Sequence, residues 1–531
     1  MTNSIILVNP NYSGSSRHAK FLYEGLMLGV LSSFLEREGF NVVICDSFFY
    51  KQTPSDAFNE LKRYSKPLIV GITLMTKEPL PWVLEYISLI RNEYKLDVHI
   101  TLGGYYPTLQ CEKIWLSIPD IDSVVIGEGE LTLLELATSL KNGKDWHAIE
   151  GIAYCSFDNK IIVNPRRKLL TDLDQLPWPK RYLALEMNED FEVLIDGSRG
   201  CIQNCSFCAI KPFFKSTQTT AWRTRSPENI INEIISIRRK NPKLYKFRFV
   251  DPDFIGPSGI GEERAFSLAL LMQQKLPGID FFIEGRAVSI KNNRMLLQEL
   301  KKAGLKSIHI GIESANQHVL DKMAKKTQVQ DNRDAVQLLR ELKIDFAYGF
   351  IMFTPWTTEL DIFENIQFME EIGNVQLYKL FNTMYLVPGT PSIKLAQKLG
   401  PIFEKGKSGN YKFSSNTPII NLLIDVWDVI KNKVSFNQSV WYLYKDTQVA
   451  IQRNTNDALR LKKLTDDLFL SMFRFCLQKA QESVDDYQMN ADLIANECVE
   501  KFKPQADAII AQLDPKIRFR RADEIRRAII K

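Results

Sequence analysis

Five short runs of apolar, largely β-branched residues lie in the first 150 residues, and segments of helix length separate them. Each run carries few polar side chains, which is typical of strands buried on both faces of a parallel sheet. Strands that alternate with helices predict a doubly wound α/β domain, because each parallel connection needs a crossover. The five expected strands are residues 4–8, 41–46, 68–74, 97–102 and 122–126.

Turn-forming residues follow four of these expected strands. In an open α/β sheet, ligands bind in the crevice beyond the carboxyl ends of the strands. Glycines there let the backbone approach a ligand closely, and free N–H groups can hold amides or a phosphate. We therefore expect a ligand site at this edge of the sheet, formed by Asn9, Pro10, Thr73, Gly103, Gly104, Tyr105, Gly127, Glu128, Gly129 and Glu130.

A second series of strand-like runs lies between residues 191 and 386. Helical segments again separate the runs, so the pattern predicts a partial or full parallel β/α barrel with its chemistry at the carboxyl ends of the strands. Six strands are expected, over residues 193–196, 247–251, 281–284, 307–312, 345–353 and 376–385.

The pattern divides the chain into four segments. A hairpin around the turn Asp158-Asn159, followed by the proline-rich stretch Leu176 to Pro179, predicts an extended linker between the two α/β segments. Apolar residues at helical spacing beyond Gly400 predict a helical C-terminal domain. The segments are the first α/β domain (1–150), the linker (151–190), the barrel (191–395) and the helical domain (396–531).

Three cysteines, Cys201, Cys205 and Cys208, lie within eight residues shortly after the first strand of the second series. A loop this short can wrap three thiolates around one metal assembly, and thiolates favour zinc or iron–sulfur clusters. A structural zinc ion wants a fourth Cys or His nearby, and the closest histidines in sequence are His147 and His309. A cubane with three protein ligands keeps one iron open. The other five cysteines are isolated and are expected to be buried as small hydrophobic residues.

The spacing Cys-x3-Cys-x2-Cys, with Phe207 just before the last cysteine, resembles that of the radical S-adenosylmethionine (SAM) superfamily. This resemblance implies a [4Fe-4S] cluster at the mouth of a partial (β/α)6 barrel. It also implies that the open iron chelates the amino and carboxylate groups of SAM, and that one electron then cleaves SAM to a 5′-deoxyadenosyl radical.

Further segments resemble the same superfamily in the order that the barrel requires. Arg223 to Glu228, with Glu233 further on, resembles the segment that opens the helix after the cluster loop, with Ser226 as the helix cap. SAM brings an ammonium, a carboxylate and ribose hydroxyls into one pocket, so acidic or hydroxyl acceptors and an arginine donor must converge there. The resemblance implies a SAM site formed by Phe207, Asp251, Asp253, Glu284, Arg286, Glu313 and Ser314.

The glycines at the strand ends of the first domain resemble those of the cobalamin-binding domain fused to many radical SAM enzymes. This resemblance implies that the ten residues expected at that edge of the sheet bind cobalamin. A flavodoxin-like domain with ordinary tight turns is the alternative interpretation. The sequence departs from many cobalamin proteins because no Asp-x-His-x-x-Gly motif is present, and His18 lies between Ser16 and Lys20 without the Asp or the Gly. We therefore expect cobalamin to bind without a histidine on the lower face of cobalt.

Four functions are compatible with these resemblances. A cobalamin-dependent radical SAM methyltransferase that acts on an unactivated carbon is the leading hypothesis, and cyclisation or ring rearrangement without methyl transfer is the second. A methylthiotransferase that modifies transfer RNA would need three further cluster cysteines, whereas the first domain has only the widely spaced Cys45, Cys111 and Cys155. A non-catalytic corrinoid or cluster sensor is the fourth.

Charge and cysteine usage limit the expected partners and location. The net charge of +5 comes from 68 basic and 63 acidic residues, which is too mild to indicate nucleic-acid binding, and the basic tail over 515–531 is expected to be a solvated helix face. No signal peptide or bilayer-length apolar stretch is apparent, so a reducing cytoplasm is expected. The expected partners are a small-molecule or peptide substrate and a reductant such as flavodoxin or ferredoxin.

Overall fold

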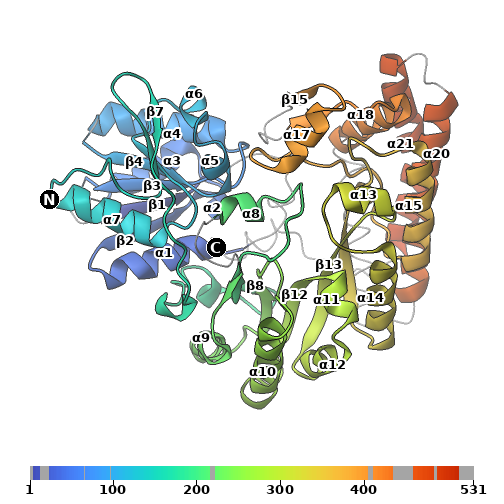
Figure 1. Ribbon diagram of the computed structural model, residues 1–531, viewed down its shortest axis with the longest axis horizontal. Coiled ribbons are helices and arrows are strands. Elements are labelled where there is room, and N and C mark those ends of the chain that lie inside the picture. The colour runs from blue at the N-terminus through green and yellow to red at the C-terminus, as the bar shows by residue number, and fades with distance from the viewer. Residues whose placement is uncertain are drawn as a thin grey trace.

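A computed structural model describes most of the chain and shows an α/β domain, a barrel and a helical region (Figure 1). His18 and the basic tail lie outside the described residues. The predicted fold class, with a parallel N-terminal sheet, a β/α barrel domain and a helical C-terminal region, is confirmed. The described residues are 4–11, 23–64, 66–95, 97–215, 222–404, 411–433, 458–482 and 487–512.

The first sheet has the strand order β2-β1-β3-β4-β5-β6-β7. The first five of these strands in chain order run parallel, and β6 and β7 add an antiparallel hairpin. The hairpin that we expected in the linker therefore continues this sheet. The strands are β1 (Ser4–Asn9), β2 (Asn41–Asp46), β3 (Ile69–Thr73), β4 (His99–Gly103), β5 (Ser123–Val125), β6 (Ile152–Cys155) and β7 (Ile161–Val163).

Helices cover both faces of this sheet, and β1 is therefore buried on both sides. Ile5 and Leu7 pack against α1 (Leu26–Arg37) and α7 (Glu130–Lys141), whereas Ile6 and Val8 face the opposite core. That opposite core includes α3 (Pro54–Leu61) and α4 (Leu80–Tyr94), and the short helices α2 (Ser47–Tyr50), α5 (Tyr105–Leu109) and α6 (Ile114–Ser117) lie in the connections.

The barrel contains a five-stranded parallel sheet in the order β14-β13-β12-β11-β8. Its strands are β8 (Glu192–Ile195), β11 (Lys246–Phe249), β12 (Asp280–Arg286), β13 (Leu305–Glu313) and β14 (Asp345–Phe350). The helices that cover its outer face include α9 (Pro227–Lys240), α10 (Ile260–Lys275), α12 (Arg294–Lys302), α14 (Val329–Glu341) and α15 (Glu359–Ile372).

The prediction of a sixth strand over residues 376–385 is wrong. The segment forms a short helix, α16 (Leu377–Leu380), and then an isolated parallel bridge between Phe353 and Thr383. Leu377, Leu380 and Phe381 are all buried, and their spacing of three and four residues is helical rather than alternating. When a segment is buried on all sides, its apolar residues do not show whether they repeat with the spacing of a helix or of a strand. The prediction of a strand over 376–385 failed for this reason.

The C-terminal helices pack against the flank of the barrel at this sixth position. The rings of Phe381 and Trp427 stack with centroids 5.0 Å apart, and Phe473 packs edge-on against Phe381. The carboxylate of Asp466 accepts hydrogen bonds from the backbone of Asn374 and Val375, both at 3.0 Å. The elements of this region are α17 (Pro391–Gln397), β15 (Ile402–Glu404), β16 (Tyr411–Phe413), α18 (Pro418–Asn432), α20 (Ala458–Glu482) and α21 (Tyr487–Ala511).

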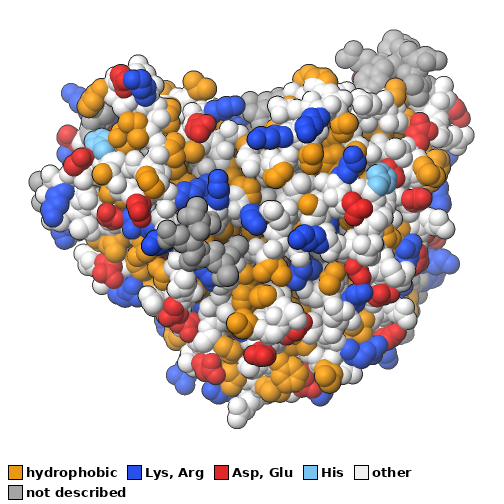
Figure 2. All heavy atoms as spheres, viewed as in Figure 1, with side chains coloured by type: hydrophobic (Ala, Val, Ile, Leu, Met, Phe, Trp, Pro, Cys, Tyr) orange, Lys and Arg blue, Asp and Glu red, His pale blue; other side chains and the backbone are white. Residues whose placement is uncertain are grey.

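Among the residues described, we find no helix with the length and apolarity needed to cross a bilayer. On the face drawn in Figure 2, acidic and basic side chains are interspersed, so the described part of this face offers nucleic acid no continuous basic surface.

Candidate functional site

A cavity of about 380 Å³ lies where the carboxyl-end edge of the first sheet meets the mouth of the barrel. The loop after β8, the helix α8 (Ile210–Phe213) and the residues after β11 form the wall on the barrel side. Gly200 lines this wall and directly precedes Cys201. The wall on the other side includes eight of the ten residues that we expected there, namely Thr73, Gly103, Gly104, Tyr105, Gly127, Glu128, Gly129 and Glu130.

Asn9 and Pro10 are not among the residues that line this cavity. The side-chain amide of Asn9 donates to Asp46 Oδ1 at 2.8 Å, and Asp46 also accepts from the hydroxyl of Tyr182 at 2.7 Å. Pro10 is buried. The end of β1 therefore serves the packing between the first domain and the linker.

The two glycines that end β4 differ in their surroundings. A Cβ atom on Gly103 would meet no heavy atom within 4 Å, so the space before it is open. Gly104 has a φ of 100°, and a Cβ atom there would lie 2.7 Å from the carbonyl oxygen of Leu74. The turn itself thus requires Gly104, and Gly103 is the position where a ligand can approach the backbone.

Tyr105 brings the first domain close to the cysteine loop. Its ring stacks on Phe213 of α8 with centroids 4.2 Å apart. Burial raises the pKa of Tyr105, and the nearby Cys208 and Asp196 raise it further. Tyr105 therefore presents a neutral phenol at neutral pH between the strand ends and the last cysteine of the loop.

Arg199 connects the two walls of the cavity, and no sequence motif points to this role. Its guanidinium donates to Glu130 at 2.7 Å, to Glu128 at 3.0 Å and to Asp196 at 2.8 Å, while Arg223 pairs with Glu128 at 2.8 Å. The side chains in this network are at most 13% exposed. Glu128 and Glu130 thus hold the first domain against the barrel, besides lining the cavity.

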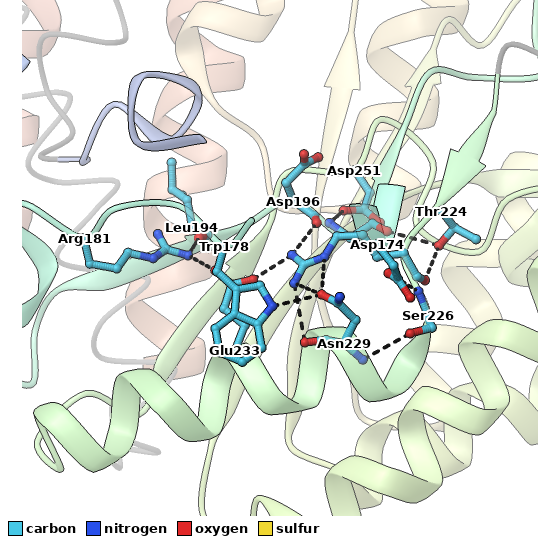
Figure 3. Close-up of polar contacts among 12 residues, drawn as sticks. Asp174, Trp178, Arg181, Leu194, Asp196, Thr224, Ser226, Asn229, Glu233 and Asp251 are labelled. Atoms are coloured by element: carbon cyan, nitrogen blue, oxygen red, sulfur yellow. Dashed lines mark hydrogen bonds and ion pairs between the residues drawn. The ribbon is translucent and has the colours of Figure 1, made fainter. Parts of the chain in front are cut away.

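A second interdomain contact centres on Glu233 of α9 (Figure 3). Arg181 donates to Glu233 at 2.6 Å. It also donates to Glu24 of the first domain at 3.3 Å. Arg225 pairs with the other oxygen of Glu233 at 2.6 Å and donates to the side chain of Asn229. The segment after the cluster loop therefore braces the two domains, and Ser226 caps α9 as expected.

The cysteine loop is fixed at both ends. The carboxylate of Asp251 accepts from the backbone of Gly197 and from the hydroxyl of Ser198, both at 2.8 Å. The backbone N–H of Ser206 donates to the carbonyl of Met323 at 2.8 Å, and the hydroxyl of Ser206 donates to the carbonyl of Lys322 at 3.1 Å. These contacts tie the loop to the residues after β11 and to the end of the short helix α13 (Gln317–Lys322).

The three cysteines of the loop are half-buried free thiols. Burial raises the pKa of each thiol, to about 11 for Cys208, so deprotonation accompanies metal binding. Among the described residues, no three Cys, His, Asp or Glu side chains could together hold a single metal ion. Three thiolates on one short loop are ligands of the kind that iron–sulfur clusters take.

The expected SAM residues divide into two groups. The side chain of Asp253 is fully buried, and its Oδ2 atom accepts a hydrogen bond from Arg286 at 2.7 Å. Its Oδ1 atom has no hydrogen-bond partner among the described residues. Glu313 accepts from Lys325 at 3.1 Å, and Glu284 is exposed on β12. These acceptors face the barrel mouth beneath the cysteine loop.

The other expected SAM residues have partners within the protein. Asp251 fixes the cysteine loop, and burial raises its pKa to about 6 although Arg264 lies beside it. The hydroxyl of Ser314 is buried against Asn316 and Asn365. Phe207 is half-buried and packs against the main core.

Comparison with known proteins agrees with this two-domain geometry. The model of the radical SAM superfamily matches residues 195–369, and that of the B12 binding domain matches residues 17–137. The chain therefore contains a radical SAM domain and a B12 binding domain. The two domains define its cofactors, which are SAM and a [4Fe-4S] cluster in the radical SAM domain and cobalamin in the B12 binding domain.

Two curated relatives and one solved structure show the range of similar proteins. An anaerobic magnesium-protoporphyrin IX monomethyl ester cyclase from Rubrivivax gelatinosus is 27% identical over 66% of this chain, and the chain spans 62% of its length. An uncharacterised methyltransferase from Pyrococcus horikoshii is 28% identical, over 73% of this chain and 81% of the relative. The cobalamin-dependent SAM radical enzyme OxsB, with aqua-cobalamin and SAM bound, has the same fold with a TM-score of 0.78 at 18% identity, over 100% of this chain and 84% of OxsB.

The cavity at the strand ends of the B12 binding domain has a mostly apolar lining. Beyond the strand ends, its lining continues between the sheet and the helices α1 and α7, where Leu28, Leu31 and Leu133 lie. A Cβ atom on Gly71 would stand 3.3 Å from Leu7, so glycine keeps this slot open. Backbone at the rim and an apolar slot behind it suit a corrin ring and its nucleotide base.

His99, the one histidine of β4, is remote from this edge. It begins the strand, whereas Gly103 ends it, and its ring bonds to the hydroxyl of Ser123 at 2.8 Å. Burial lowers the pKa of His99 to about 4, so it is neutral at physiological pH. His99 therefore lies outside the strand-end crevice.

Proposed function

We propose that this chain is a cobalamin-dependent radical SAM enzyme that methylates an unactivated carbon of a small-molecule or peptide substrate. The observation that carries this proposal is the cavity itself, because Gly103 of the B12 binding domain and Gly200, next to Cys201, line the same hollow. A methyl carrier and a radical source must act on one substrate, so their sites must open into one chamber.

In this proposal, the residues described above hold the cofactors. Cys201, Cys205 and Cys208 bind the cluster, Asp253 and Glu313 accept hydrogen bonds from SAM, and the strand-end backbone around Gly103 receives cobalamin. When bound, the cluster supplies the electron that cleaves SAM, and cobalamin supplies a carrier for the methyl group. The stacked rings of Tyr105 and Phe213 close one side of the chamber and exclude water from it.

Ring closure or rearrangement without methyl transfer is the second candidate. The similarity to the Rubrivivax cyclase favours it, as the similarity to the Pyrococcus methyltransferase favours methylation. Incubation of the anaerobically reconstituted enzyme with candidate substrates and SAM carrying a CD3 group distinguishes the two. A product heavier by one CD3 group supports methylation, and a product without the label supports rearrangement.

Two other hypotheses find less support. A methylthiotransferase needs a second cluster, but the only cysteines before residue 160 are the widely spaced Cys45, Cys111 and Cys155, and Cys45 is buried. A sensor would not turn SAM over, so formation of 5′-deoxyadenosine under reducing conditions excludes it. All eight cysteines are free thiols, which supports a cytoplasmic enzyme supplied with electrons by a flavodoxin or ferredoxin.

A further inference from the structure

A small basic hollow adjoins the larger cavity at the strand ends. Its volume is about 30 Å³, which holds about two or three water-sized groups. The two hollows share five lining residues, namely Gly127, Glu128, Glu130, Arg199 and Phe213. The basic hollow therefore has room for one small group of a ligand whose remainder lies in the larger cavity.

Five basic and two acidic side chains line the basic hollow, and both acids are already paired. Arg199 donates to Glu130 at 2.7 Å and to Glu128 at 3.0 Å, and Arg223 also pairs with Glu128. Positive charge therefore remains in excess on the side of the linker and α8. The residues that carry it are Arg166, Arg167, Lys168 and Lys215.

The two arginines are held by groups of the protein and fix the walls of the hollow. One terminal nitrogen of Arg166 donates to the carbonyls of Pro212 at 3.0 Å and Phe213 at 2.9 Å, which ties the linker to α8. Arg167 pairs with Glu135 of α7. The linker wall is thus fastened to both neighbouring elements.

Lys168 and Lys215 reach the hollow from the two walls that Arg166 joins. Both side chains are exposed, and the described residues give neither ammonium an acceptor. Each ammonium has three donors. Two such groups at one hollow repel each other, and an anion between them removes this repulsion.

We propose that the basic hollow binds a phosphate group of the substrate through Lys168 and Lys215. A phosphate dianion balances two ammonium charges, and a lysine binds phosphate as a point charge from any direction. The rest of the substrate then extends past Phe213 into the larger cavity. This inference rests on the proposed function and narrows its substrate to a phosphorylated small molecule.

Differential labelling of lysines in the holoenzyme tests this without knowledge of the substrate. An amine-acetylating reagent is applied in inorganic phosphate, or in chloride of the same ionic strength, and peptide mass spectrometry measures the rate at each lysine. Phosphate between two ammonium groups should bind with a Kd on the order of 1 mM, so about 10 mM phosphate should slow labelling of Lys168 and Lys215 about 10-fold. Lys211 of α8 is exposed and does not line the hollow, so it is the internal control and should label equally in both salts.

Each of the two lysines also reports on the other. Lys168→Met should weaken the protection of Lys215 by phosphate, and Lys215→Met should weaken that of Lys168, each about 10-fold in the phosphate concentration required. Lys211→Met is the matched control and should leave both protections unchanged. All three side chains are exposed, so the variants should fold as wild type does.

Candidate substrates that carry a phosphate should protect both lysines, and their dephosphorylated forms should not. Three results would overturn the inference. Equal labelling in phosphate and chloride would mean that the two lysines are only solvated. Protection by cobalamin but not by cobinamide, which lacks the nucleotide phosphate, would assign the hollow to the cofactor.

The third result concerns the reductant. If the double variant Lys168→Met with Lys215→Met slows cluster reduction by flavodoxin but not by dithionite, and phosphate gives no protection in wild type, the lysines dock the reductant instead. Failure of the wild type to cleave SAM or to retain cobalamin would refute the proposed function, and the labelling result would stand apart from it.

Discussion

Replacement of Arg199 by Gln should loosen the B12 binding domain from the barrel. Arg199 is 5% exposed and faces three carboxylates at 2.7 to 3.0 Å, two of which belong to the first domain. Without it, Glu128 retains Arg223, but Glu130 keeps no ion-pair partner in the network. Removal of one partner from a buried ion pair costs about 3–5 kcal/mol.

This cost should fall on the interdomain contact rather than on either core. Hydrogen exchange measured by mass spectrometry should show faster exchange at residues 127–130 and 196–200, with the strands of both sheets unchanged. Arg333→Gln is the matched control, because Arg333 pairs with Glu371 at an exposed site where a salt bridge contributes about 0–1 kcal/mol. Adding Glu130→Gln to Arg199→Gln should restore part of the lost stability.

The reasoning is refuted if Arg199→Gln and Arg333→Gln unfold at the same urea concentration and exchange alike. It is also refuted if the second substitution, Glu130→Gln, lowers stability further by its full independent amount. Either result would mean that the network contributes no more than a surface ion pair.

Three further predictions concern the cofactors and the pH dependence. Alanine at each of the three loop cysteines should abolish the iron–sulfur absorbance and SAM cleavage, whereas Cys155→Ala should change neither; a variant of all three that keeps its iron would contradict the assignment. Gly103→Leu should fill the open space before the strand end and abolish cobalamin retention, while circular dichroism should show an intact fold. If the variant retains as much cobalamin after gel filtration as wild type does, the proposed site is wrong. Burial raises the pKa of Asp251 to about 6, above the value of about 3.9 in an unfolded chain, so the folded state holds this proton more tightly. The stability of wild type relative to Asp251→Asn should therefore fall as pH rises from about 4 to about 6, and urea titrations that show a rise would disprove this.

Cobalt coordination remains a prediction from the sequence. Because the motif Asp-x-His-x-x-Gly is absent and His99 lies at the far end of β4, cobalamin should bind without a histidine on its lower face. Electron paramagnetic resonance of the Co(II) form should show high-field lines without nitrogen triplets. Triplets that vanish in a histidine-to-alanine variant would prove the opposite.

Local sequence determined the elements of this protein and the cysteine loop that we propose binds the cluster. Alternation of apolar runs with helical segments predicted the order of strands and helices, because periodicity reports which faces of an element are buried. The three cysteines were found because one loop of eight residues carries all of them. Where apolar residues are buried on every side, as at Leu377 and Leu380, the period was lost and the predicted strand is a helix.

The tertiary structure alone decided which polar groups meet. Arg199 and Glu130 are 69 residues apart in sequence, and nothing in the local pattern of either names the other. The same holds for Asp251, which fixes the cysteine loop, and for Lys325, which faces the cluster loop from a different strand connection. The periodicity of a sequence shows which faces of each single element are buried. The partner of a buried charge depends instead on how separate elements pack, so it is decided only when the two domains come together.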